Sequence, residues 1–166
     1  MAIRDGSQYT NGLRDGREVW YGGERVADVT KFPYFEAAVR SIAELYDMQH
    51  LEDTRQLLVC HSEDLGEEIG RSFQIPRTAE DLRLKREAYF LWAQANCGMI
   101  GRSPDFLNVM LAALAAKKSF FAEDSVERAN NVVEYYRFVA TNDLFMTHAL
   151  LDPQLDKGKL RNEQSD

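Results

Sequence analysis

The sequence has few of the residues that common metal and cofactor motifs require. Its 166 residues include three histidines and two cysteines, Cys60 and Cys97. It contains no Cys-x-x-Cys pair, no His-Glu-x-x-His motif, no Gly-x-Gly-x-x-Gly fingerprint and no Walker-type phosphate loop. We therefore expect no metal ion, no iron–sulfur cluster held by this chain alone and no disulfide framework. The two cysteines are interpreted as buried thiols in a reducing compartment.

Basic residues and long hydrophobic runs are also scarce. Lys and Arg number 20 against 27 Asp and Glu, which gives a net charge of -7. Binding to nucleic acid needs a basic face, so no such partner is expected. The longest apolar run, Val109 to Ala116, is too short to span a membrane, and the first residues carry no secretion signal. The sequence predicts a cytoplasmic location and no membrane partner.

The remaining composition is that of a globular protein, with 45% apolar and 28% charged residues in 166. Residues 1–33 are rich in glycine, and two extended pieces flank Gly22-Gly23. This pattern predicts a β-hairpin arm. Residues 34–152 are expected to form a helical domain, and residues 153–166 a polar linker or tail. The predicted fold class is therefore mainly α, with a small N-terminal β-hairpin arm.

Apolar periodicity and capping signals predict four main helices. They are expected over residues 34–47 after Pro33, over 79–97 with Thr78 as N-cap, after Ser103-Pro104 with a nearly all-apolar stretch from Phe106 to Leu114, and from Asp124-Ser125 to Asn142. Residues 56–60 and 71–75 are expected to be extended and to form a second, looser hairpin. Residues 144–150 are expected to form a short extended piece.

Arg102 lies in the connection between the second and third expected helices, just before the N-cap Ser103. A guanidinium at the start of a nearly all-apolar helix could hold an anionic oxygen together with the free amides of the first turn. A surface arginine on a helix–helix connection explains the same pattern. The residues alone leave both interpretations open.

His148 lies in an apolar run that ends at Asp152-Pro153. A histidine in such a place could act as a general acid or base, or donate a hydrogen bond to a ligand oxygen. The alternative is a core histidine whose ring nitrogens are satisfied by the protein.

Six segments in order, between about residues 4 and 157, carry a resemblance to a known family. They are Arg14 to Tyr21, Arg25 to Thr30, Tyr46 to His50, Pro76 to Leu82, Gly101 to Phe106, and Thr147 to Leu150 followed by Asp152 to Asp156. With these segments the chain resembles the N-terminal part of the large oxygenase component of 4-hydroxyphenylacetate 3-hydroxylases. Those enzymes are two-component monooxygenases that depend on reduced FAD.

The resemblance implies a fold and an activity. The family fold is similar to that of acyl-CoA dehydrogenases, with an N-terminal helical domain, a middle β domain and a C-terminal bundle that makes a tetramer. This chain would supply the first part, and residues 153–166 would lead toward the absent β domain. The implied function is ortho-hydroxylation of a phenol with O2 and FADH2 supplied by a separate flavin reductase, in a homo-oligomer.

The resemblance also implies roles for particular residues. Arg102 and His148 would be catalytic and would contact the substrate hydroxyl group, and Phe106 would line the substrate pocket. His148, Ala149, Leu150 and Gln154 would lie beside the flavin. Phe106 stands where the 4-hydroxyphenylacetate enzymes have tyrosine, so a different phenol is expected.

Two other functions remain open at this point. The chain could be a non-catalytic, truncated relative that serves protein association. The same superfamily also contains a radical dehydratase of a hydroxyacyl-CoA, which needs cysteine ligands. Cys97 is followed four residues later by Gly101, which is no ligand, so the sequence favours the hydroxylase.

Overall fold

The computed structural model describes residues 3–98, 105–147 and 158. Within them the chain is mainly helical, with two small antiparallel hairpins. In chain order the elements are α1 (Gly6–Gly12), β1 (Val19–Tyr21), β2 (Glu24–Val26), α2 (Glu36–Asp47), α3 (Glu52–Leu58), β3 (Val59–Ser62), β4 (Glu67–Gly70), the 3-10 turn η1 (Arg71–Phe73), α4 (Ala79–Ala95), α5 (Asp105–Ala116), α6 (Lys118–Ala122) and α7 (Val126–Thr141).

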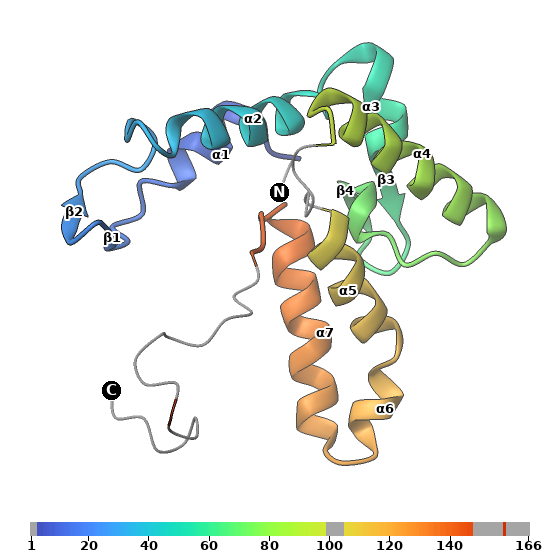
Figure 1. Cartoon of the computed structure of the whole chain (residues 1–166). Coiled ribbons are helices and arrows are strands. Elements are labelled where there is room, and N and C mark those ends of the chain that lie inside the picture. Colours follow the sequence, from blue (N-terminus) through green and yellow to red (C-terminus); the bar gives the residue numbers. More distant parts are fainter. Residues whose placement is uncertain (1–2, 99–104, 148–157, 159–166) are drawn as a thin grey trace.

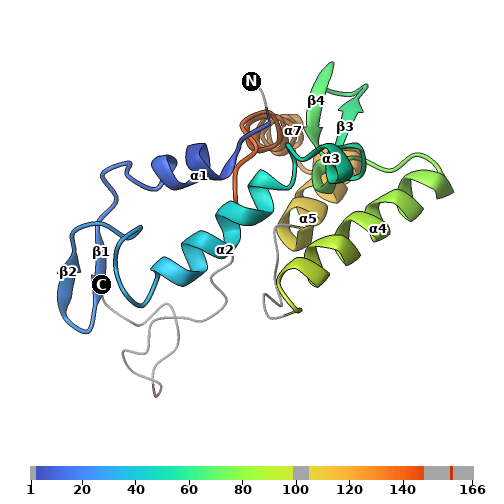
Figure 2. The ribbon, with the colours of Figure 1, turned by 90° about the horizontal axis from the view of Figure 1, so that it is seen from above.

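The helices form two groups around a central helical hairpin. α5 and α7 lie side by side, joined through α6 at one end (Figure 1). α1 and α2 lie on one side of this hairpin and α4 lies on the other, with the β1–β2 arm at the far end of α2 (Figures 1 and 2). In the part of the chain that the structure describes, we find no helix that is long and apolar enough to cross a membrane.

Two hydrophobic cores hold this arrangement together. The first core joins β4 and η1 to the α5–α7 hairpin and consists of Ile69, Phe73, Leu111, Ala112, Ala115, Tyr136, Val139 and Ala140. The second core joins α1, α2, α3 and α4 and consists of Tyr9, Ile42, Leu45, Tyr46, Leu58, Ala88 and Trp92. Burial of large apolar side chains such as Phe73 and Leu58, both 0% exposed, is the main favourable contribution to folding.

Several elements confirm the sequence-based expectations. β1 and β2 pair with Val19 opposite Val26 and turn at Gly22-Gly23, where both glycines have positive φ. α2 and α4 match the expected helices, and the Thr78–Asp81 capping box forms in both directions. α7 begins after Ser125, whose side chain accepts from the Arg128 amide, and ends at the C-cap Asn142.

Two expectations about the first half of the chain are wrong. Residues 56–58 are the last turn of α3 and not a strand, so the second hairpin pairs Val59–Ser62 with Glu67–Gly70, and residues 71–73 form η1. Helix α1 is also absent from the sequence prediction. Its glycines have low helix propensity, but a capping box between Asp5 and Gln8 starts it and packing on α2 completes it. Gly6 permits that packing, because a Cβ there would lie 2.5 Å from the Ala43 carbonyl oxygen.

α4 and α7 end in the same unusual way. Cys97 (φ 55°) and Asp143 (φ 47°) are the non-glycine residues with positive φ among those described. Each is the first residue beyond a C-cap, and the next residue's amide donates back to the helix, Gly98 to Ala93 and Leu144 to Val139. This is the Schellman arrangement, which usually uses glycine. Cys97 is exposed, contrary to the expected buried thiol, because this turn carries it out of the helix.

We expect Cys97→Gly to raise the free energy of unfolding by about 0.5–1 kcal/mol, because glycine adopts positive φ without the steric cost of a Cβ. Urea denaturation of the 166-residue chain measures it. An unchanged or lower stability would show that the left-handed turn carries no such cost. Cys60→Ser, at a half-buried position in β3, tests whether the effect comes merely from losing a thiol.

Candidate functional site

The sequence-predicted site residues fall mostly outside the described residues. Arg102, His148, Ala149, Leu150 and Gln154 all lie there. Phe106 is described in the first turn of α5, with 45% of its surface exposed. The structure does describe both helix ends that lead to the predicted catalytic residues, since Cys97 comes five residues before Arg102 and Asp143 five residues before His148.

The segment 144–147, which leads to His148, runs between the two cores. Leu144 and Met146 pack against the first core, whereas Phe145 packs against the second and its ring lies 6.1 Å from that of Tyr9. Side chains that alternate between two faces indicate an extended backbone. This agrees with the extended piece expected here, although these residues join no sheet. The segment is therefore held on both sides as far as Met146, two residues before His148.

An apolar groove opens beside this segment, between α5 and α7. Its volume is about 640 Å³, within the range of pockets that hold small ligands. The only polar side chains among its lining residues, apart from the Tyr135 hydroxyl, are Asn131 and Thr147. The lining residues are Leu107, Met110, Leu111, Leu114, Asn131, Val132, Tyr135, Val139, Leu144, Phe145, Met146 and Thr147. We call it the apolar groove, and its walls suit an aromatic ring.

A second groove, of about 700 Å³, also borders this segment. We call it the N-terminal groove because α1 and the residues around it form most of its wall; it is lined by Arg4, Gln8, Tyr9, Gly12, Leu13, Asp15, Arg17, Asn142, Leu144, Phe145 and Thr147. Arg17 is paired with Asp15 at 2.7 Å, and the Arg4 guanidinium lies over the rings of Tyr9 and Tyr46. Thr147, the last described residue before His148, lines both grooves.

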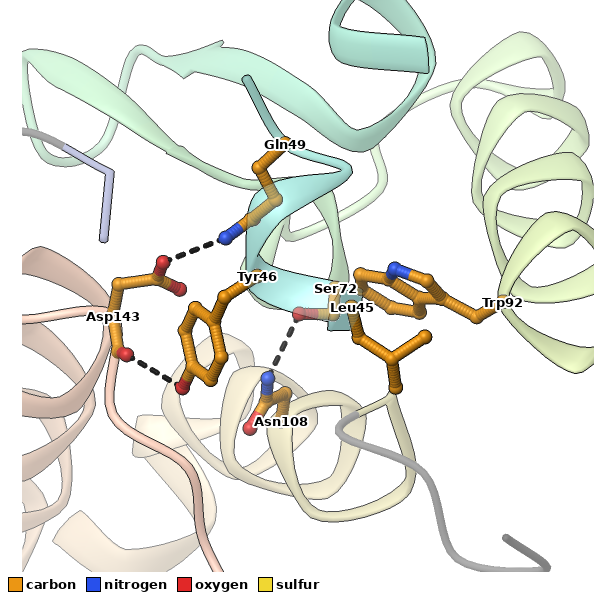
Figure 3. Close-up of a pocket in the computed structure, with 7 residues that line it drawn as sticks. All are labelled: Leu45, Tyr46, Gln49, Ser72, Trp92, Asn108 and Asp143. Carbon is orange, nitrogen blue, oxygen red and sulfur yellow. Dashed lines mark hydrogen bonds between the residues drawn. The ribbon is translucent and has the colours of Figure 1, made fainter. Parts of the chain in front are cut away.

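Asp143, at the start of this segment, is the centre of a buried polar network (Figure 3). Its side chain accepts from Gln49 Nε2 at 2.8 Å and from the Arg4 backbone amide at 3.1 Å. Its backbone carbonyl accepts from the Tyr46 hydroxyl at 2.9 Å. Asp143 is 5% exposed and Gln49 is 3% exposed, so these bonds form away from water and lose little strength to it.

Burial raises the pKa of the Asp143 carboxyl above its ordinary value. The hydrogen bonds from Gln49 and the Arg4 amide, and the positive charge of Arg4, favour the ionised form but do not outweigh desolvation. Burial likewise raises the pKa of the Tyr46 phenol, and the nearby Asp143 carboxyl adds to the shift. Tyr46 therefore remains a hydrogen-bond donor at neutral pH.

The raised pKa of Asp143 makes the stability of the folded protein depend on pH. The unfolded chain loses the Asp143 proton at a lower pH than the folded protein does, so the folded state becomes relatively less stable as pH rises from about 4 through the folded pKa. We expect the stability of the wild type relative to Asp143→Asn to fall over this window. Urea unfolding of both proteins at a series of pH values tests it, because all other carboxyl groups are common to both. If the stability of the wild type relative to Asp143→Asn stays constant or rises with pH, the raised pKa of Asp143 is contradicted.

The small cavity beside this network is part of the packed interior. It holds about 10 Å³ and is lined by Leu45, Tyr46, Gln49, Ser72, Trp92, Asn108 and Asp143 (Figure 3). That volume is far below what an aromatic ligand needs. Asn108 Nδ2 donates to Ser72 Oγ at 2.8 Å across it. The two grooves are therefore the better candidates for ligand binding.

Sequence reasoning assigned no role to Asp143, Gln49 or Tyr46. A signal was present, since Tyr46 and Gln49 both lie in the segment 46–50 that carries part of the family resemblance. The periodicity of α2 explained Tyr46 as an apolar core position, and nothing local indicated that its hydroxyl reaches a residue 97 positions away.

Comparison with known proteins gives a consistent result over nearly the whole chain. The family model described as the N-terminal part of 4-hydroxyphenylacetate 3-hydroxylase matches residues 5–166. The oxygenase component of 4-hydroxyphenylacetate 3-monooxygenase from Thermus thermophilus is 43% identical over 98% of this chain. This chain covers 33% of that relative, so it spans about a third of the relative's length.

Solved structures agree with the sequence comparisons. A crystal structure of the oxygenase component of 4-hydroxyphenylacetate 3-monooxygenase, complexed with FAD and 4-hydroxyphenylacetate, is 43% identical with a TM-score of 0.85, and the match covers 98% of this chain and 33% of that one. A 4-hydroxybutyryl-CoA dehydratase from N. maritimus is 25% identical with a TM-score of 0.79, over 99% of this chain and 33% of that one. These matches bear out the mainly α, acyl-CoA-dehydrogenase-like fold expected from the sequence.

Proposed function

This chain belongs to the 4-hydroxyphenylacetate 3-hydroxylase family, and from that membership we propose that it is the N-terminal part of an oxygenase that hydroxylates a phenol ortho to its hydroxyl group. The reaction converts phenol, FADH2 and O2 into catechol, FAD and water. The observation that carries the proposal is the family match over residues 5–166. The apolar groove beside the segment that leads to His148 supports it.

The chain's own residues have distinct tasks in this proposal. Bound reduced FAD supplies the electrons and activates O2. Arg102 places a positive charge beside the phenol oxygen and stabilises the phenolate, which is the reactive form of the ring. His148 accepts the phenol proton. Phe106 would form an apolar wall of the substrate pocket, and His148, Ala149, Leu150 and Gln154 would help to hold the flavin.

The described residues fit an aromatic ligand in this region. The apolar groove has walls of leucine, methionine, valine and tyrosine side chains, and Thr147 adds a hydroxyl group at the point where the chain continues to His148. Apolar walls exclude water, which strengthens the electrostatic effect of a guanidinium such as Arg102 on a bound phenolate.

The substrate is proposed to be a phenol other than 4-hydroxyphenylacetate. Phe106 retains the apolar surface of the family's tyrosine but lacks its hydroxyl group. A lost hydrogen bond to a substrate oxygen costs about 0.5–1.5 kcal/mol. A substrate that presents an apolar group at this position would bind without that loss.

Partners and location follow from the same proposal. A separate flavin reductase supplies FADH2, and the oxygenase is a homo-oligomer. We place the reaction in the cytoplasm, because the free thiols of Cys60 and Cys97 suit a reducing compartment.

A second candidate function is protein association without catalysis. Large side chains on α6 and α7 are exposed, with Phe120 at 69%, Tyr135 at 54% and Phe138 at 54%. An apolar face of this kind is typical of an interaction surface. In the oxygenase proposal the rest of the enzyme covers such a face.

Flavin binding separates the two functions. By assembled oxygenase we mean this chain together with the part of the family's oxygenase that it does not span. The two parts can be joined in one polypeptide or combined as two. In an anaerobic titration we expect the assembled oxygenase to bind FADH2, and this chain alone to bind it more weakly because other segments hold much of the flavin. Failure of the assembled protein to bind FADH2, with retained self-association, would favour the association module.

A further inference from the structure

The turn at Asp143 determines where the chain goes after α7. Asp143 adopts a left-handed conformation, with φ 47°, and ends the helix. Its own amide donates to the Ala140 carbonyl, and the Leu144 amide donates to the Val139 carbonyl at 3.1 Å. After this reversal only four residues, 144–147, separate Asp143 from His148.

Four hydrogen bonds from distant parts of the chain hold this turn. Gln49, just beyond the end of α2, and the Arg4 amide, before α1, donate to the Asp143 side chain. The Tyr46 hydroxyl, from α2, and the Arg4 guanidinium, at 3.5 Å, donate to the Asp143 backbone carbonyl. Figure 3 shows Gln49 bonded to the Asp143 side chain and Tyr46 bonded to the Asp143 backbone carbonyl. The turn is thereby fixed to the second core as well as to its own helix.

The network is also fitted closely to its surroundings. A Cβ at Gly70, at the end of β4, would lie 3.1 Å from Gln49 Oε1 and 3.3 Å from Asp143 Oδ1. The side chains of Gln49 and Asp143 are therefore confined between α2, α7 and β4. A simple helix cap would need only the left-handed backbone, and neither the buried carboxyl nor its two donors.

We propose that Asp143 is a positioning residue for His148, and that it acts as a hydrogen-bond acceptor that ties the 144–147 segment to Gln49 and to the backbone of Arg4. The proposal rests on the function proposed above, because it concerns the histidine of that reaction. Small displacements of a catalytic group lower the rate strongly, so a fixed turn five residues upstream is of direct use to catalysis.

Three substitutions separate the backbone turn from the acceptor. Asp143→Asn keeps both the left-handed conformation and a side-chain oxygen. Asp143→Gly keeps the turn and removes the acceptor. Gln49→Leu leaves Asp143 in place and removes one donor, so it remains informative if the glycine variant does not fold. Gln56→Leu, at an exposed position in α3, is the matched control for Gln49→Leu.

The first readout is amide hydrogen exchange in the 166-residue chain, which needs no flavin. For Asp143→Gly and Gln49→Leu we expect exchange of the 144–147 amides to accelerate by about tenfold or more, while amides in the middle of α7 keep their protection. Asp143→Asn and Gln56→Leu should exchange like the wild type. Unchanged exchange at 144–147 in both Asp143→Gly and Gln49→Leu would overturn the proposal.

The second readout is the yield of hydroxylated phenol per FADH2 oxidised by the assembled oxygenase. We expect this yield to fall by about 3- to 10-fold in Asp143→Gly and Gln49→Leu, with FADH2 affinity retained, and to stay within about 2-fold in Asp143→Asn. Wild-type yield in all variants, or an equal loss in Asp143→Asn, would overturn the proposal while the hydroxylase function stands. A wild-type protein that binds FADH2 and hydroxylates no phenol would overturn the proposed function, and with it the role of Asp143.

Discussion

Replacing Arg102 with alanine is expected to lower kcat/KM for phenol hydroxylation by the assembled oxygenase about 10²–10³-fold. The guanidinium supplies the positive charge that stabilises the phenolate, and alanine leaves that charge unbalanced in an apolar pocket. Arg102→Lys keeps the charge without the planar pair of donors, so it should recover part of the rate. The measurement is steady-state product formation at saturating FADH2 and varied phenol.

Arg128 offers a matched control. Arg128 pairs with Asp124 at the start of α7 and is largely exposed. Arg128 lines neither groove, so Arg128→Ala should keep the wild-type rate. Wild-type turnover in Arg102→Ala, measured beside this control, would remove Arg102 from the mechanism.

Replacing Arg71 with methionine is expected to lower the free energy of unfolding by about 3–5 kcal/mol, because several buried carbonyl groups lose their hydrogen-bond donor. Arg71 is 7% exposed and donates to the carbonyl oxygens of Gln56, Leu57 and Val59, and to Gln74 Oε1. Two of these carbonyls belong to the last turn of α3, where a cation is also favoured by the helix dipole. Methionine preserves most of the apolar contact of the side chain, so the loss reports the hydrogen bonds.

Urea denaturation of the 166-residue chain measures this effect, with Arg83→Met as the control. Arg83 lies on the exposed face of α4 and pairs only with Glu80 and Glu87 among the groups the structure describes around it. Exposed ion pairs contribute little to stability, so a much smaller loss is expected there. Equal losses in the two variants would contradict the proposed role of Arg71 at the end of α3.

The structure around Arg71 explains why one part of the fold could not be predicted from the sequence. The run from Gln56 to Cys60 contains leucine and valine without a clear helical or alternating pattern, and this composition predicts a strand. Its first half is helical because a cation 12 to 15 residues further along binds its terminal carbonyls. No local pattern contains that contact. By contrast, Thr78–Asp81 and Ser125 are local signals, and both were recognised.

In the candidate site, too, some residues are indicated by local sequence and others only by long-range contacts. Arg102 and His148 were identified from their places beside an apolar helix and in an apolar run, and their roles came from the family resemblance. The turn at Asp143, five residues before His148, depends instead on Gln49 and Arg4, which lie 94 and 139 positions away in the sequence. Residues brought together over such separations are determined by packing of the two cores, and only the structure reveals them.

We propose that this chain supplies the phenol-binding side of a reduced-flavin hydroxylase. The most direct test is to load the assembled oxygenase with FADH2 under anaerobic conditions, add a phenol, admit O2, and quantify hydroxylated product against FADH2 oxidised. We predict that nearly every FADH2 oxidised yields one ortho-hydroxylated product, and that this yield collapses in Arg102→Ala. Oxidation of the flavin to give only hydrogen peroxide, across a panel of phenols with and without polar para substituents, would contradict the account.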